Sequence, residues 1–187
     1  MHSLIIFASG AGSNAKAIID FLKIHPIAQV SLIVCNKPQA GVLQIAADEN
    51  IPTLIIDKVS FQETSFIETL QQYQPSLLVL AGFLWKIPEA VVQAFPNKII
   101  NIHPALLPKY GGKNMYGSHV HAAVLAAKES SSGITIHYVN EVYDEGEIIL
   151  QAHCSVSATD TIESLAHKIH QLEHFYFPRA IQFLLNR

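Results

Sequence analysis

The 187-residue chain is poor in charge and has no basic cluster. Only 14% of its residues are charged, and Lys+Arg 12 against Asp+Glu 15 gives a net charge of −3. A protein that binds DNA or a large RNA normally carries a positive surface, so the composition argues against a nucleic-acid partner. Half of the residues are hydrophobic. A mainly disordered chain is therefore excluded, because this much apolar surface can offset the entropy of ordering.

Cysteine and long apolar runs are also scarce. Cys35 and Cys154 are the two cysteines, with no metal-ligand spacing and no disulfide pattern, which is typical of a reducing compartment. The apolar start MHSLIIFASG has no basic flank and leads into a glycine loop rather than a cleavage site. The longest uncharged apolar run, residues 77–85, is too short to span a bilayer. We therefore expect a cytoplasmic protein without membrane association, built as one domain over residues 1–187.

Apolar stretches of strand length alternate with longer stretches of helical periodicity. Most of the strands are apolar at consecutive positions, as in strands covered on both faces. The alternation predicts an α/β protein with a doubly wound, mostly parallel, Rossmann-like sheet of about seven strands and helices on both faces. Strands are predicted at 4–8, 30–35, 53–56, 77–81, 98–101, 133–139 and 148–155, and helices at 14–24, 39–49, 61–73, 88–95, 119–128 and from 161 to about Pro178.

The first strand runs directly into the loop SGAGSNA at 9–15, where a helix begins. The loop fits G-x-G-x-x-A, in which glycines let backbone N–H groups approach a phosphate at a helix N-terminus. A dinucleotide site also needs an acidic residue after the second strand, but Cys35-Asn36-Lys37 stands there, and no G-x-x-x-x-G-K-[ST] motif occurs. The favoured ligand is a single phosphate or a phosphosugar. A tight turn capped by Ser13 or Asn14 is the alternative.

The fifth predicted strand leads into Asn101-Ile102-His103, at the sheet edge where open α/β proteins place their sites. Residues two apart on an extended segment face the same side, so Asn101 and His103 project together. An amide donor beside a titratable imidazole suits a developing oxyanion. A buried histidine with a backbone partner is the alternative interpretation.

Several longer motifs accompany this pair in a fixed order. They resemble the folate-dependent formyltransferases, and in particular the phosphoribosylglycinamide formyltransferases of purine biosynthesis. The resemblance implies transfer of a formyl group from 10-formyltetrahydrofolate, as co-substrate, to glycinamide ribonucleotide, with no metal. The motifs are SGAGSN at 9–14, NK at 36–37, LAGFLWKIP at 80–88, NIHPALLPKYGG at 101–112, GITIHYVNEVYDEGEIILQ at 133–151 and EHFYFP at 173–178.

The resemblance also implies roles for the matching residues. Catalysis would rest on Asn101, His103 and Asp144, although an aspartate in Y-D-E-G is more often a turn residue. The glycinamide amine would lie near Glu173, and residues 1–102 and 103–187 would form a phosphate-binding half and a folate- and catalytic-loop half. Because such loops usually contain a cis proline, the Leu107–Pro108 bond is predicted to be cis. The phosphate would bind at Gly12, Ser13 and Asn14, and the folate at Leu84, Trp85, Lys86, Ile87, Asn101, Asn140, Glu141, Val142 and Tyr143.

Three features differ from the usual family pattern. Trp85-Lys86 stands where an arginine and an aliphatic residue are expected, the stretch at 111–121 is longer than usual, and His170 replaces a frequent glutamine. The differences affect two expectations: the conformation of the segment 109–118, which we expect to form a lid over the site, and the residues that contact the carboxylates of the folate tail. Those carboxylates would meet Lys58 or Lys86, although such lysines are more often plain solvated charges.

Relatives with other acceptors supply the first alternatives. Methionyl-tRNA formyltransferases carry an added C-terminal domain for tRNA, whereas this chain is expected to stop near the end of the catalytic domain. Formyltetrahydrofolate hydrolases usually carry an added N-terminal domain, and their version of the 101–110 loop differs. A 10-formyltetrahydrofolate hydrolase, or a formyltransferase with another amine acceptor, remains the alternative to the ribonucleotide enzyme.

A zinc hydrolase is a more remote alternative. His170-Gln171-Leu172-Glu173-His174 matches H-x-x-E-H, an inverted zinc-peptidase motif. At about 100° per residue the histidines at 167, 170 and 174 lie opposite the apolar stripe, and Glu173 falls at its edge. His119 and His121, two apart on a predicted helix, point in different directions. We interpret the histidines at 167, 170 and 174 as a solvent-exposed face, and His119 and His121 as poor co-ligands. A catalytically silent nucleotide-binding module is the third possibility, since it needs no convergence of Asn101, His103 and Asp144.

Overall fold

The computed structural model describes residues 1–186. Within these residues the strands form one seven-stranded sheet in the order β3-β2-β1-β4-β5-β6-β7. The first five strands pair in parallel, and β6 and β7 join one edge antiparallel. The predicted doubly wound, mostly parallel sheet is confirmed. The strands are β1 (His2–Ala8), β2 (Ala28–Cys35), β3 (Thr53–Ile55), β4 (Leu77–Leu80), β5 (Ile99–His103), β6 (Ser131–Tyr138) and β7 (Ile148–Ser155).

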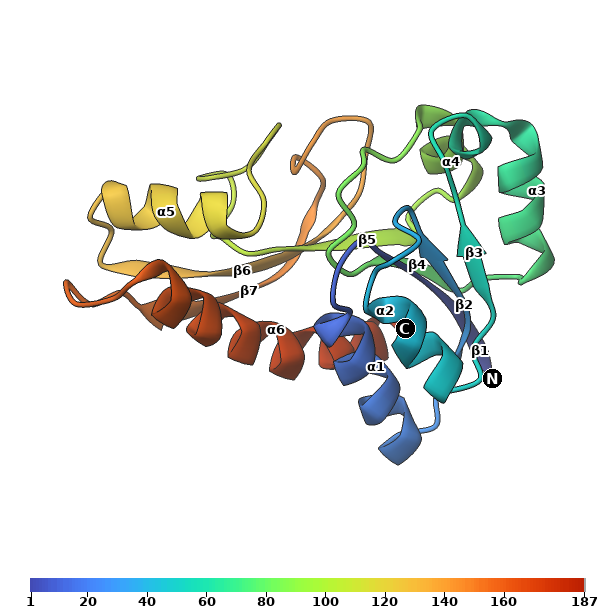
Figure 1. The fold of residues 1–187 in the computed structure, drawn as a ribbon, viewed down its shortest axis with the longest axis horizontal. Coiled ribbons are helices and arrows are strands. Elements are labelled where there is room, and N and C mark those ends of the chain that lie inside the picture. Colours follow the sequence, from blue (N-terminus) through green and yellow to red (C-terminus); the bar gives the residue numbers. More distant parts are fainter. Residues whose placement is uncertain (187) are drawn as a thin grey trace.

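Helices cover both faces of this sheet, as Figure 1 shows. Alternate residues of β1 enter different cores: Leu4 and Ile6 pack with α1, α2, α5 and α6, whereas Ile5 and Phe7 pack with α3 and α4. Because both faces are buried, the strands need apolar residues at consecutive positions. The helices are α1 (Ser13–Ile24), α2 (Val42–Asp48), α3 (Thr64–Gln72), α4 (Glu89–Ala94), α5 (Ser118–Ala126) and α6 (Ile162–Leu185), with a 3₁₀ turn η1 (Ser60–Gln62).

The predicted end of the last helix is wrong. α6 continues through Pro178 to Leu185 instead of ending near the proline. A proline inside a helix costs about 3 kcal/mol, but Phe177 and Ile181 are both buried within one turn of it. Their burial contributes about 1.5–3 kcal/mol each, enough to keep the helix continuous. None of the helices within residues 1–186 is both long and apolar enough to cross a membrane.

The predicted helix at 61–73 is also corrected. It is divided into η1 and α3 by Glu63, whose extended backbone (φ −82, ψ 148) cannot continue a helix. Asp57 fixes the preceding turn, since its carboxylate accepts hydrogen bonds from the backbone N–H groups of Val59 and Ser60. The other predicted elements agree with the structure to within three residues at each end.

The register of β5 against β6 determines which side chains meet at the sheet edge. Asn101 lies opposite His137, and His103 lies opposite Thr135. Facing residues on antiparallel strands are direct neighbours. Above this edge, the segment after β5 and the loop between β6 and β7 rise on the same side of the sheet (Figure 1). These four side chains therefore lie beneath two converging loops.

Candidate active site

A cavity of about 490 Å³ opens at the carboxyl ends of the parallel strands. It lies where the strand order reverses between β1 and β4, the position at which open α/β sheets bind ligands. Its wall is formed by residues 10–14, 80–87, 101–104, 112–117, 139–140 and 142–144 together with His121, His137, His170 and Glu173. Residues from both halves of the sequence therefore contribute to one site.

Asn101 is oriented by a histidine that faces it across the sheet. The Asn101 Nδ2 lies 3.1 Å from His137 Nε2. His137 Nδ1 donates to the Tyr138 carbonyl at 2.8 Å, so its Nε2 is the acceptor for the Asn101 amide. Burial lowers the pKa of His137, which favours this neutral form. One amide hydrogen of Asn101 is thus engaged, and the second remains for a ligand.

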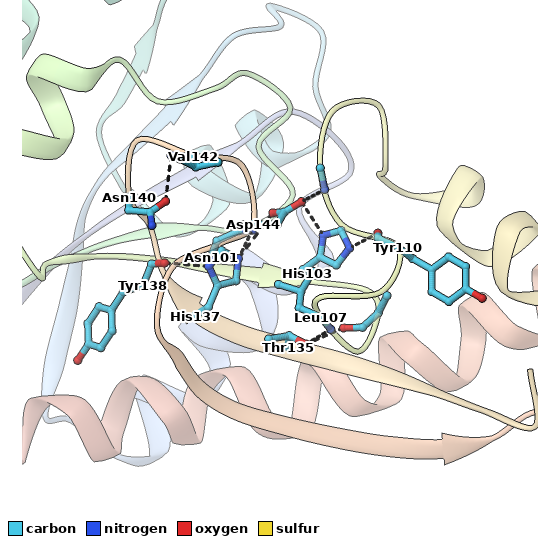
Figure 2. A network of polar contacts seen from close by, with 12 residues as sticks. Asn101, His103, Leu107, Tyr110, Thr135, His137, Tyr138, Asn140, Val142 and Asp144 are labelled. Atoms are coloured by element: carbon cyan, nitrogen blue, oxygen red, sulfur yellow. Dashed lines mark hydrogen bonds and ion pairs between the residues drawn. The ribbon is translucent and has the colours of Figure 1, made fainter.

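His103 is buried, with 3% of its surface exposed. Its Nε2 donates to the Tyr110 carbonyl at 2.8 Å, and its Nδ1 lies 3.6 Å from Asp144 Oδ2 (Figure 2). The ring therefore turns one nitrogen to the backbone and the other to a carboxylate. When protonated, it forms an ion pair with Asp144 and presents positive charge to the cavity.

Asp144 comes from the loop between β6 and β7 and reaches back over β5. Its Oδ2 accepts a hydrogen bond from the Gly112 N–H at 2.8 Å, and its Oδ1 lies 3.7 Å from His137 Nε2. The carboxylate thus lies between two imidazoles, as Figure 2 shows. The loop can close only because residue 146 is glycine: a Cβ there would lie 1.7 Å from the Tyr138 carbonyl oxygen. Asp144 is therefore more than a turn residue, because its carboxylate contacts Gly112, His103 and His137 outside its own turn.

The segment after His103 is tied to β6 and β7 by side chains beneath it. The Thr135 hydroxyl donates to the Ala105 carbonyl at 2.7 Å and accepts from the Leu107 N–H at 3.0 Å. Gln151 donates to the Leu107 carbonyl at 2.9 Å. The Leu107–Pro108 bond is cis, as predicted. These contacts fix the course of the chain from His103 to Tyr110.

The other end of the cavity is built on the glycine loop. Gly12 precedes α1 in a left-handed conformation (φ 83), and a Cβ there would lie 2.8 Å from the Cβ of Val42. No side chain of the described residues caps this end of α1, so the alternative with Ser13 or Asn14 as the cap is wrong. The first N–H groups of the helix therefore face the cavity with the positive end of the helix dipole, which suits an anion.

Glu173 lies beside this helix end. It is in the middle of the buried row of α6 rather than at its edge, and it accepts a hydrogen bond from Asn14 Nδ2 at 2.9 Å. Burial raises the pKa of Glu173 from 4.5 to about 7, and the contact with Asn14 lowers it only in part. This end of the cavity thus contains a carboxylate that changes charge near neutral pH.

The wall predicted to hold the folate is mostly apolar, with Lys86 and Asn140 as its polar members. Leu84, Trp85, Lys86 and Ile87 line the cavity on one side, and Asn140, Val142 and Tyr143 on the other, whereas Glu141 is exposed and is not part of the wall. The Lys86 ammonium lies 5.6 Å from the centre of the Tyr143 ring, so the two sides touch across the opening. Lys58 lies outside the lining. Lys113, on the segment predicted as a lid, belongs to it.

The histidines of α6 do not converge with Glu173. His170 and His174 are exposed and stack with ring centres 6.1 Å apart, while the Glu173 carboxylate is buried against Asn14. On α5, His119 is exposed and His121 is buried, so they point apart as predicted. Residues 1–186 contain no group of three or more His, Cys, Asp or Glu side chains that could hold a metal ion.

Sequence reasoning missed His137, Thr135 and Tyr110 as parts of the site. Thr135 and His137 alternate on β6 and lie opposite the Asn101–His103 pair. The alternation is visible in GITIHY, but the register of two strands separated by about 30 residues is not. A neutral histidine beside Asn101 could therefore be identified only from the structure.

Comparisons with known proteins agree with the geometry. The family described as "Formyl transferase" matches residues 2–181. The phosphoribosylglycinamide formyltransferase of Bacillus subtilis is 39% identical over 191 residues, covering 99% of this chain and 95% of its own length. The chloroplastic phosphoribosylglycinamide formyltransferase of Arabidopsis thaliana is 41% identical over 185 residues, and the chain covers 63% of that protein. A crystal structure of the phosphoribosylglycinamide formyltransferase from Bacillus halodurans has a TM-score of 0.90 at 32% identity, covering 99% of this chain and 96% of that one.

Proposed function

The chain belongs to the formyl transferase family, and we propose that it transfers the formyl group of 10-formyltetrahydrofolate to the amine of glycinamide ribonucleotide in de novo purine biosynthesis. The observation that carries the proposal is the meeting of Asn101, His103 and Asp144 on one wall of a cavity whose other end is a helix N-terminus. The three side chains suit acyl transfer, and the helix N-terminus suits the phosphate of the acceptor.

The formyl carbon is attacked directly by the amine. A new C–N bond forms, the carbonyl π electrons move to oxygen, and a tetrahedral oxyanion results. The free N–H of Asn101 and the protonated His103 stabilise this charge. Donors of this kind are worth about 10²–10³ in rate, and they are already oriented here by His137 and the Tyr110 carbonyl.

Collapse of the intermediate breaks the bond from carbon to N10 of the folate. The attacking nitrogen must lose a proton, and N10 must gain one. Asp144, whose Oδ2 lies 3.6 Å from His103 Nδ1, accepts the proton from the attacking amine, directly or through one water. His103, at the same wall, is the proton donor to the leaving nitrogen.

The acceptor is recognised by charge at both of its ends. The phosphate lies against the backbone N–H groups of Gly12, Ser13 and Asn14 at the start of α1. The amine end lies near Glu173, whose ionised form attracts a positive charge. Water as an acceptor would use neither feature, which is why a hydrolase is the less favoured function.

The folate occupies the apolar end of the cavity. Leu84, Trp85 and Tyr143 offer flat or branched apolar surfaces of the kind that bind an aromatic ring. Lys86, Ile87, Asn140 and Val142 line the cavity beside them. Formyl transfer by these residues involves no metal ion. The partners we propose are therefore two small molecules, with no nucleic acid or membrane.

One unit over residues 1–187 is proposed to perform the whole reaction. Its 1–102 half supplies the phosphate site and its 103–187 half supplies the catalytic loops. We also place the reaction in the cytoplasm. Cys35 and Cys154 are free thiols, which is compatible with a reducing compartment.

The test is the dependence of cofactor consumption on the acceptor. The purified chain with 10-formyltetrahydrofolate alone should consume it slowly, and addition of glycinamide ribonucleotide should accelerate consumption with formylated ribonucleotide as the product. Glu173→Ala should raise the KM for the ribonucleotide and leave the affinity for tetrahydrofolate unchanged. An unchanged rate, with free formate accumulating, would establish the hydrolase function instead.

A further inference from the structure

A main-chain carbonyl fixes the orientation of His103. The Tyr110 carbonyl accepts from His103 Nε2 at 2.8 Å, so the proton of the neutral ring lies on Nε2 and Nδ1 faces Asp144 (Figure 2). A small movement of this carbonyl would turn the ring or allow the other tautomer. The position of the Tyr110 backbone is therefore part of the catalytic geometry.

The Tyr110 backbone is held in an unfavourable conformation. Its φ of +58 is left-handed, which a residue with a Cβ adopts only when surrounding contacts impose it. Thr135 anchors the preceding segment at Leu107. The anchor at Tyr110 itself is its own side chain, whose hydroxyl donates to Glu129 Oε1 at 2.8 Å.

Glu129 is a rigid anchor because its backbone is part of the hydrogen-bonded turn that closes the C-terminal end of α5. Its N–H bonds to the Val124 carbonyl at 3.3 Å, and the Lys128 N–H bonds to the Leu125 carbonyl at 3.0 Å. With Lys128 left-handed (φ 53), these are the two hydrogen bonds of a Schellman motif. β6 begins at Ser131, two residues later. The Glu129 backbone is thus hydrogen-bonded to the helix end and lies two residues before the sheet.

The same carboxylate oxygen receives a second donor of a different kind. Lys109 Nζ lies 2.8 Å from Glu129 Oε1, but the Lys109 side chain is 68% exposed. An ion pair in this setting contributes little, whereas the Tyr110 hydroxyl is part-buried and bound to a charged acceptor, which makes a stronger hydrogen bond. Both donors lower the pKa of Glu129 and keep it ionised. The chain therefore offers two donors to one carboxylate, only one of which leads to His103.

We propose that Glu129 is a positioning residue for His103, acting through the Tyr110 hydroxyl and the Tyr110 backbone carbonyl. Glu129 does not line the cavity. Its effect on rate rests on the proposed formyl transfer, but its effect on the His103 ring does not. Loss of the anchor releases the strained Tyr110 backbone and with it the hydrogen bond that selects the Nε2–H tautomer.

Two variants remove the anchor from opposite ends. Glu129→Ala and Tyr110→Phe should each lower kcat about tenfold, well within the roughly 100-fold cost of a misplacement of about 1 Å. The KM values for both substrates should stay within about twofold, because Glu129 does not line the cavity. Glu129→Gln, which keeps an oxygen acceptor for the Tyr110 hydroxyl, should restore most of kcat. Combining Glu129→Ala with Tyr110→Phe should lower kcat no further than either change alone.

Histidine ¹⁵N NMR measures the tautomer of the His103 ring, which a loss of overall stability would not change. In the wild type, at a pH high enough for the ring to be neutral, the His103 resonances, assigned by comparison with His103→Gln, should report the Nε2–H tautomer. In Tyr110→Phe and Glu129→Ala, the ratio of Nε2–H to Nδ1–H should fall about fivefold, the factor expected for the loss of one ordinary hydrogen bond. Lys109→Met is the matched control. It removes the exposed donor to the same oxygen and should leave both kcat and the tautomer unchanged.

The outcomes separate the two proposals. Wild-type kcat and an unchanged tautomer in Tyr110→Phe would overturn the positioning role, and so would a Lys109→Met variant impaired as strongly as Glu129→Ala. If Glu129→Ala does not fold, Tyr110→Phe decides alone, because it deletes a single oxygen atom. A wild-type chain without formyl transfer would remove the proposed function, while the tautomer ratio would still decide whether Glu129 positions the ring.

Discussion

Asn14, at the start of α1, donates its side-chain N–H to Glu173 in the middle of α6, 159 positions later in the sequence. The hydrogen bond connects the helix end proposed to bind the phosphate with Glu173, the carboxylate of α6 that lines the cavity. Because Glu173 has 6% of its surface exposed, burial outweighs the Asn14 contact, and the pKa of Glu173 rises to about 7. The proposed recognition of the acceptor is thereby coupled to pH at one residue.

The stability of the free protein should report this residue directly. Between pH 4.5 and 7 the folded chain keeps a proton on Glu173 that the unfolded chain has released. The free energy of unfolding therefore falls as the pH rises through this window, by about 3 kcal/mol for this group. Urea unfolding at pH 5 and pH 8 should show this loss in the wild type relative to Glu173→Gln. His137, whose lowered pKa acts in the opposite direction, is common to both proteins. An identical pH dependence of the unfolding free energy in the wild type and Glu173→Gln would contradict the burial of an ionisable Glu173.

Gly12 should not tolerate a side chain. An alanine Cβ would meet Val42 at 2.8 Å and Ile45 at 2.9 Å, and its φ of +83 would be strained. We expect Gly12→Ala to lower the free energy of unfolding by about 2–4 kcal/mol, the sum of overpacking and backbone strain, and to abolish the thermal stabilisation caused by inorganic phosphate. Gly10→Ala is the control, since nothing lies within 4 Å of its Cβ, and it should cost less than about 1 kcal/mol. Equal stability of both variants would contradict the close packing of the loop on α2.

Trp85 provides an optical probe of the folate wall. It is the single tryptophan of the chain, it lines the cavity, and its ring centre lies 5.8 Å from that of Phe61. Tetrahydrofolate should quench its emission in proportion to binding. Trp85→Phe keeps an aromatic face and should bind tetrahydrofolate about 3–10-fold more tightly than Trp85→Ala, the range expected for one aromatic contact. Unchanged emission at saturating tetrahydrofolate would place the folate elsewhere.

The sequence alone was sufficient to predict the fold, the uncapped helix N-terminus after the glycine loop and the common orientation of Asn101 and His103. Consecutive apolar residues on β1 and β2 predict a sheet covered on both faces, and the glycine loop predicts a helix N-terminus with free N–H groups. The alternation of Asn101 and His103 predicts that they face the same side. In each case the determining forces act within a few residues, so a local pattern records them.

Other parts depend on contacts between distant segments. The position of His137 opposite Asn101 follows from the register of β5 and β6, which no local pattern specifies. The burial of Glu173 and the passage of α6 through Pro178 depend on how that helix packs on the sheet. The contact from Glu129 to Tyr110 joins the end of α5 to a loop 19 residues earlier. Hydrophobic periodicity contains no information on such pairings.

The central claim is that Asn101, His103 and Asp144 act as one catalytic unit, and paired substitutions test it most directly. Single-turnover rates should be measured with 10-formyltetrahydrofolate and glycinamide ribonucleotide for the wild type, His103→Ala, Asp144→Asn and the double variant. The account predicts that each single change lowers the rate at least about 100-fold, with near-native unfolding midpoints and substrate affinities, and that the double variant is little worse than either. A folded His103→Ala or Asp144→Asn variant with near-normal turnover would contradict it.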